Sequence, residues 1–129
     1  MRAGDAFNDA QRAELERVVS NADRLTGLSF LLHVGRLEGG RAGAEALLAG
    51  SGDQAARTVL VAVDPTSRDL HIVTGRRAAA RIDDRTCALA ALAMTSAFAA
   101  GDLVGGIRDG VTLLANHGRA GAVRHLDTV

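Results

Sequence analysis

The chain has 129 residues, of which 47% are hydrophobic and 23% charged, a balance typical of one folded domain. Fifteen Lys and Arg residues balance fifteen Asp and Glu residues, and the resulting formal charge of zero disfavours binding to nucleic acid. The most apolar segment, residues 86–100, is shorter than the roughly 20 residues that cross a bilayer, so we expect a buried helix and no membrane insertion. A single cysteine and an N-terminus without a signal-like apolar stretch favour a soluble cytoplasmic protein.

Helix and strand patterns alternate along the first part of the chain. Asn8 and Gln11 have the spacing of a capping box, and the apolar residues that follow predict a helix over about residues 9–25, ended by Gly27. A period of two over residues 28–34, with Leu28, Phe30, Leu32 and Val34 on one face, predicts a strand. Glycine-rich residues 38–43 predict a flexible connection, and a short helix is expected over residues 44–49.

Two further strands are predicted in the middle of the chain. The run over residues 58–63 is apolar on both faces, which is typical of an interior strand covered by helices on each side. Turn residues then lead to a strand over residues 69–74, so these two strands form a hairpin. The crossover helix between the first two strands predicts that they run parallel.

Two helices are expected in the second half. Asp83 or Asp84 can cap a long apolar helix that ends near residues 98–100, and the last helix begins after Asp102. Gly106 and Gly110 lie one turn apart in that last helix and predict close packing against a neighbour. The predicted fold is therefore α/β: a small mixed sheet, with a parallel pair plus a hairpin strand, flanked by helices on both faces. We expect one domain over residues 8–118 and a flexible tail over residues 119–129.

Several short motifs carry a resemblance to a known family. They are VLVAVD, RDLHIVTG, an aspartate before a helix, and FAAGDLVGGIRDGVTLLA. In this order they resemble the TPM domain family, in particular small actinobacterial members of unassigned function, over about residues 8–117. The resemblance implies the same mixed sheet with helices on both faces. For function it implies acid phosphatase activity, calcium binding, or assistance to membrane protein complexes.

Acidic residues near the predicted strand ends are candidate metal ligands. We expect Asp53, Asp83 and Asp84 to contribute, because hard cations such as calcium take several oxygen ligands, and the resembled family has its aspartate near Asp83 or Asp84. Asp102 is a less certain member. Asp64 is excluded, because the hairpin places it at the opposite end of the sheet. The alternative role of these aspartates is helix capping and turn formation.

Arginines around the same end of the sheet are candidate anion ligands. Arg57, Arg76 and Arg77 can hold a phosphate or carboxylate through paired hydrogen bonds. Arg77, Arg81 and Arg85 would share one helical face if residues 76–85 were continuously helical. The alternative for these arginines is a solvated surface.

These features predict a non-enzymatic, soluble binding domain of TPM type that contacts a protein partner or a small anionic ligand. The alternative is a metal-assisted, acid-phosphatase-like hydrolase in which Arg76 or Arg77 orients the phosphate. Cys87 lies within the apolar helix, so we expect a buried thiol that reacts slowly. The sequence does not indicate an oligomeric state.

Overall fold

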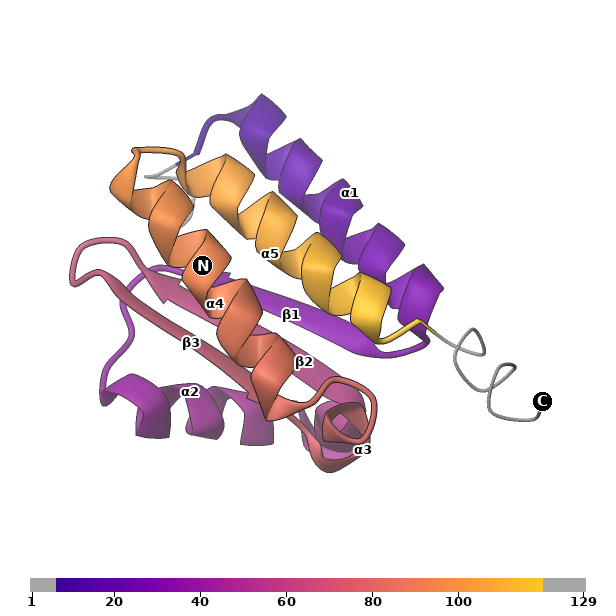
Figure 1. Ribbon diagram of the computed structural model, residues 1–129. Helices are drawn as coiled ribbons and strands as arrows, with labels where there is room; N and C mark the ends of the chain where they lie inside the picture. The colour runs from indigo at the N-terminus through magenta and orange to yellow at the C-terminus, as the bar shows by residue number, and fades with distance from the viewer. Residues whose placement is uncertain (1–6, 120–129) are drawn as a thin grey trace.

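The structure, a computed structural model, describes residues 7–119 and confirms the predicted fold class (Figure 1). Its elements are α1 (Asp9–Thr26), β1 (Ser29–Val34), α2 (Gly40–Ala49), the 3-10 helix η2 (Gly52–Arg57), β2 (Thr58–Asp64), β3 (Asp69–Thr74), α3 (Arg76–Ala79), α4 (Asp84–Ala99) and α5 (Leu103–His117). Most of the predicted tail, residues 120–129, lies outside the described residues.

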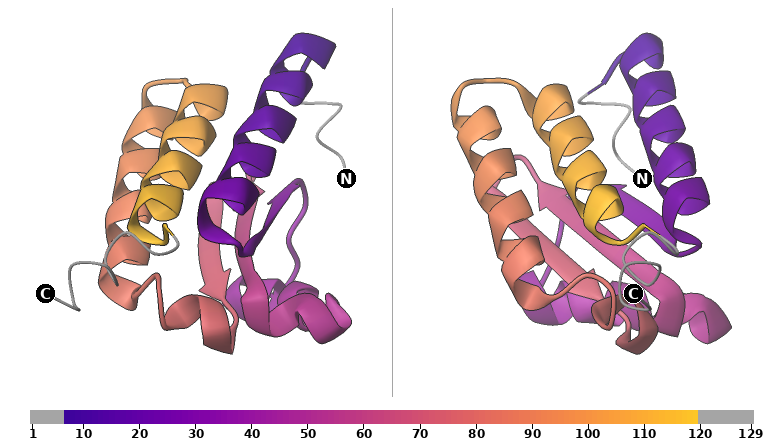
Figure 2. Two further views of the ribbon diagram at one scale, coloured as in Figure 1. Left: turned by 90° about the vertical axis from the view of Figure 1, so that its right-hand side faces the viewer. Right: turned by 45° about the vertical axis from the view of Figure 1, so that its right-hand side comes forward.

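The sheet has the order β1-β2-β3, with β1 parallel and β3 antiparallel to β2, as the connections predict. Helices α1, α5 and α4 cover one face, side by side in that order, and α2 covers the other (Figure 2). All seven residues of β2 are buried, because layers of helices cover both of its faces. The apolar run over residues 58–63 thus correctly predicted an interior strand.

The core has two parts, one on each side of the sheet. The larger part joins the three-helix layer to Val59, Val61 and Val63, and the smaller one joins α2 to Leu60 and Ala62. Burying an aliphatic side chain of this size contributes about 1.5–3 kcal/mol. Alternation along β2 therefore divides its stabilisation between both layers.

Helix α1 begins and ends at the predicted residues for local reasons. Asn8 Oδ1 accepts from Gln11 N at 2.8 Å while Gln11 Oε1 accepts from Asn8 N at 3.0 Å, so the capping box is confirmed. Gly27 ends the helix with a left-handed φ of 73°, which glycine adopts without steric cost.

Strand β1 is fastened to α1 by a side chain. Phe30 N donates to Asp23 Oδ1 at 2.7 Å. Burial raises the pKa of Asp23, and this hydrogen bond opposes the rise. Within the described residues β1 pairs with β2 alone, so its other side is an edge of the sheet.

One prediction of local structure was wrong. The glycine-rich connection is largely helical, because α2 already begins at Gly40. The condition under which three arginines would share one helical face is not met, because α3 ends at Ala79 and α4 begins at Asp84. Arg77, Arg81 and Arg85 therefore do not share one helical face.

Candidate functional site

The elements that carry the predicted acidic and basic residues lie at one end of the sheet, as the hairpin requires. Gly75 N donates to Thr58 O at 2.8 Å, which places the end of β3 beside the start of β2. A side chain at Gly75 would overlap the backbone of Ala55, so η2 and α3 can approach only because this residue is glycine. Asp64 pairs with Asp69 at the opposite end, in agreement with its exclusion.

The three candidate metal ligands are not drawn together at this end. Asp83 caps α4, accepting from Thr86 N at 2.9 Å and from Thr86 Oγ1 at 2.8 Å, and these hydrogen bonds lower its pKa. Asp53 and Asp84 are exposed in η2 and in the first turn of α4. Within residues 7–119 no three His, Cys, Asp or Glu side chains are grouped to hold a metal ion. Calcium binding here stays a prediction that requires these side chains to move towards one another.

Two of the arginines at this end bind the backbone. Arg57 donates to Gly27 O, and Arg81 donates to Thr26 O at 2.7 Å and also to Gly118 O. These carbonyls lie at the C-terminal ends of α1 and α5, where helices leave acceptors without partners. Arg57 and Arg81 thus join helix ends, which is a structural role that the sequence pattern does not reveal.

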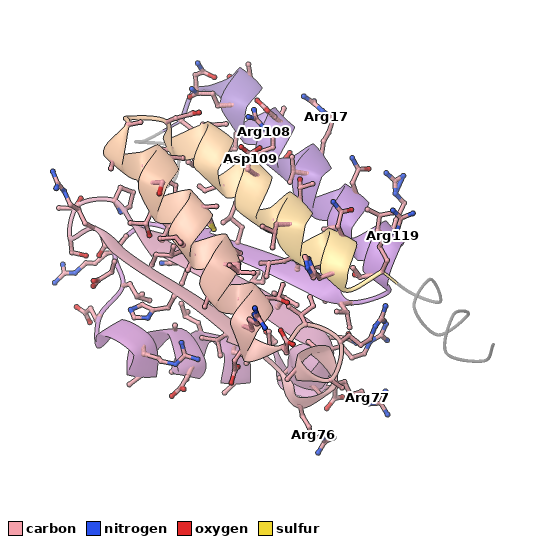
Figure 3. The ribbon with its side chains drawn as sticks, in the orientation of Figure 1. Arg17, Arg76, Arg77, Arg108, Asp109 and Arg119 are labelled. Carbon is pink, nitrogen blue, oxygen red and sulfur yellow. The ribbon has the colours of Figure 1, made fainter. Side chains whose placement is uncertain are left out.

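Arg76 and Arg77 differ from those two arginines. Both are exposed on α3, and Figure 3 shows them pointing away from the body of the molecule. The described part of the chain offers neither of them a salt bridge. They are the predicted anion ligands that remain available to solvent.

The opposite end of the sheet contains a groove of about 410 Å³ between the β2–β3 turn and α4. Asp64 is only 6% exposed there and accepts from Leu37 N at 3.0 Å, Thr66 N at 3.2 Å and Ser67 N at 3.4 Å. These bonds, chiefly that from Leu37, lower the pKa of Asp64. The carboxylate thereby holds the β1–α2 connection and the β2–β3 turn. The groove is lined by Val63, Asp64, Pro65, Arg68, Asp69, Leu70, Thr95, Phe98, Ala99, Gly101 and Leu103.

Helix α4 has an apolar face that the fold leaves uncovered. Its inward residues pack against α5 and the sheet, but Leu89 is 49% exposed and Leu92 is 66% exposed. No charged residue occurs between Arg85 and Asp102. We call the exposed positions Arg85, Ala88, Leu89, Leu92, Ala93 and Ser96 the α4 surface.

The exposure of this surface was not predicted. A helix that is apolar all round is usually buried, and the prediction of a buried helix is wrong for its outer face. The pattern alone could not show that α4 is an outer helix of its layer, separated from α1 by α5 (Figure 2). Charge-free Thr86–Gly101 was the available signal.

Cys87 is half-buried beside the core rather than fully buried. Burial raises the pKa of its thiol, and the nearby carboxylates of Asp84 and Asp83 raise it further. A slow reaction with thiol reagents stays a prediction that a low thiolate fraction supports. Among the described helices, none combines the length and hydropathy that crossing a bilayer requires.

Comparison with solved structures shows where this fold recurs. The BA42 protein from the psychrophilic bacterium Bizionia argentinensis, determined by NMR, superposes with a TM-score of 0.78 and is 13% identical, covering 87% of this chain and 81% of its own. At this identity the likeness shows the fold alone. Comparison with curated proteins gave no match.

The sequence comparison corrects the predicted family. Residues 2–115 match the family described as Domain of unknown function (DUF5130), and no finding shows a TPM assignment. The TPM prediction is therefore wrong. The motifs behind it were short glycine turns, a hairpin and helix caps, which unrelated α/β domains use for the same steric reasons. The chain belongs to the DUF5130 family.

Proposed function

We propose that this chain is a non-catalytic binding domain that receives a protein partner on the α4 surface. The observation that carries the proposal is the exposure of Leu89 and Leu92 in a helix without charged residues from Thr86 to Gly101. Contiguous exposed apolar surface is typical of interaction sites, since leaving it in water is unfavourable. The partner should therefore present an apolar, weakly charged surface of its own.

The groove extends this surface at the end of α4. Thr95, Phe98 and Ala99 line the groove. Thr95 lies within one turn of Leu92, and Phe98 and Ala99 lie within one turn of Ser96. A partner lying along α4 can therefore insert one side chain between the helix and the β2–β3 turn. A cytoplasmic setting is part of the proposal, because a lone free thiol suits a reducing compartment.

Site-specific photocrosslinking in cells tests this function. A photoreactive phenylalanine analogue at Ala93 should form an adduct that mass spectrometry identifies, and Leu92→Glu should abolish it by placing a charge in the contact. The matched control places the analogue at Leu47 of α2, which is 39% exposed on the other side of the sheet. Absence of an adduct at Ala93, or an adduct unaffected by Leu92→Glu, contradicts the proposal.

A second candidate function is the binding of a small anion by Arg76 and Arg77. Their exposure and their lack of a salt bridge within residues 7–119 favour it. Inorganic phosphate should then raise the melting temperature of the wild-type protein and not that of the Arg76→Ala/Arg77→Ala variant. Equal shifts for both proteins would remove this candidate. We do not propose the metal-assisted hydrolase, because the family resemblance behind it is overturned.

A further inference from the structure

The central part of the α4 surface has the same sequence in both directions. Residues 88–93 are Ala-Leu-Ala-Ala-Leu-Ala, and Thr86 and Thr95 flank them symmetrically. At 100° per residue, the pairs Leu89/Leu92, Ala88/Ala93 and Arg85/Ser96 are all centred on one direction of the helix. That direction is the exposed one, because Ala90 and Met94, on the opposite side of the helix, are fully buried.

An antiparallel copy of α4 matches this surface residue for residue. About a two-fold axis through its centre, Leu89 faces Leu92 of the second copy, and Ala88 faces Ala93. Such an isologous contact is self-complementary, and the alanines allow the two helices to approach closely.

Charge also favours the antiparallel arrangement. Helix α4 has no basic residue in its last turn, where a cation would stabilise the partial negative charge of the helix C-terminus. Arg85 lies exposed near the opposite end of the helix. In the antiparallel pair each Arg85 faces Ser96 of the other copy and can reach that last turn. Each helix therefore supplies the cation that the C-terminus of the other helix lacks.

We propose that the partner of the α4 surface is a second copy of this chain, which forms a two-fold dimer through antiparallel α4 helices. This inference rests on the proposed function and names its partner. The dimer would bury both exposed leucines of each copy and leave Arg76 and Arg77 in solvent.

Sedimentation equilibrium of the purified full chain over a hundredfold range of concentration tests the dimer. We expect a monomer–dimer equilibrium that Leu92→Glu weakens by at least about tenfold. Because Leu92 is 66% exposed, this variant should fold, and its circular dichroism and melting temperature check that it does. Leu47→Glu is the matched control and should dimerise like the wild type, since Leu47 lies on α2.

A charge exchange tests the register. Arg85→Glu and Ser96→Arg should each weaken the dimer, the first by repelling the partner's helix terminus and the second by facing the partner's Arg85. The double variant should recover affinity, because Glu at 85 then faces Arg at 96 of the other copy. Within one helix these positions are about 16 Å apart, so they cannot pair internally.

A wild-type protein that stays monomeric, a dimer unaffected by Leu92→Glu, or a double variant no tighter than the single variants overturns the inference. The proposed function is tested separately by the crosslinking experiment. If the adduct at Ala93 contains a different protein while the purified chain is monomeric, the binding role stands and the second copy is excluded. If no adduct forms but the purified chain dimerises through α4, the inference stands for the isolated protein and the cellular role fails.

Discussion

Among single residues, Asp64 has the most connected carboxylate in the structure's described part. It accepts three backbone N–H groups from two segments, so its ionised form stabilises a contact between the β1–α2 connection and the β2–β3 turn. Its role was not visible in the sequence, where an aspartate before Pro65 indicates only a turn. The partner Leu37 lies 27 positions away, and no local pattern predicts such a bond.

The lowered pKa of Asp64 gives a pH dependence with a definite sign. An aspartate whose pKa is lower in the folded protein stabilises the fold above the unfolded value of about 3.9, and this stabilisation is lost as pH falls through the folded pKa. Asp64→Asn should therefore reduce the free energy of unfolding most at neutral pH, and the difference from wild type should shrink in strong acid. Urea denaturation at several pH values measures it. A difference that does not change with pH would assign the effect to packing, and Asp69→Asn should show a smaller loss.

Between elements, the most extensive contact is that of α4 with α5. A side chain at Gly106 would overlap Phe98 and Ala97, and one at Gly110 would overlap Met94, which confirms the close packing that the glycine spacing predicted. The two glycines thus explain why α4 lies beside α5, although they could not predict which helix would be the neighbour.

Gly110→Ala should destabilise the protein through this contact. Overpacking costs about 1–3 kcal/mol, and the better helix propensity of alanine offsets up to about 1 kcal/mol of it. Met94→Ala alone should cost about 2–5 kcal/mol by leaving a cavity. The double variant should lose less than the sum of the two, since the new methyl group occupies the vacated space. If urea denaturation gave strictly additive losses of unfolding free energy, Met94 would not be the side chain that the new methyl group at position 110 overlaps.

Elements differ in how far their sequence determined them. β2 was predictable because the five consecutive residues 59–63 are apolar, and α1 because its cap and its terminating glycine are local. α2 was predicted to start late, since Gly39 and Gly40 resemble a loop and adopt left-handed φ values of 83° and 56° at the very start of the helix. Of the candidate site, the shared end of the sheet followed from topology. The hydrogen bonds from Arg57 and Arg81 to backbone carbonyls did not follow from topology, because they depend on where α1 and α5 end.

In the whole molecule, Arg81 joins segments that are far apart in the chain. Arg81 lies in the connection between α3 and α4, and its guanidinium binds carbonyls at the ends of α1 and α5, 55 and 37 residues away. Arg81→Met keeps the apolar stem and leaves these acceptors unpaired, so it should lower the free energy of unfolding by about 1–3 kcal/mol. Chemical denaturation measures the change. Arg77→Met is the matched control and should stay within about 0.5 kcal/mol, because Arg77 is exposed on α3.

The hydrogen bond from Phe30 to Asp23 has a consequence for aggregation. An unpaired edge strand is a template on which other chains can add strands, and β1 is such an edge. By occupying the N–H of Phe30, the carboxylate of Asp23 removes a donor that an incoming strand would need. Its pKa is raised whereas the pKa values of Asp64 and Asp83 are lowered. Acidification therefore protonates Asp23 at the sheet edge before it protonates Asp64 and Asp83, which hold the turn and the helix cap. Strand addition at β1 then becomes easier while the domain is still folded.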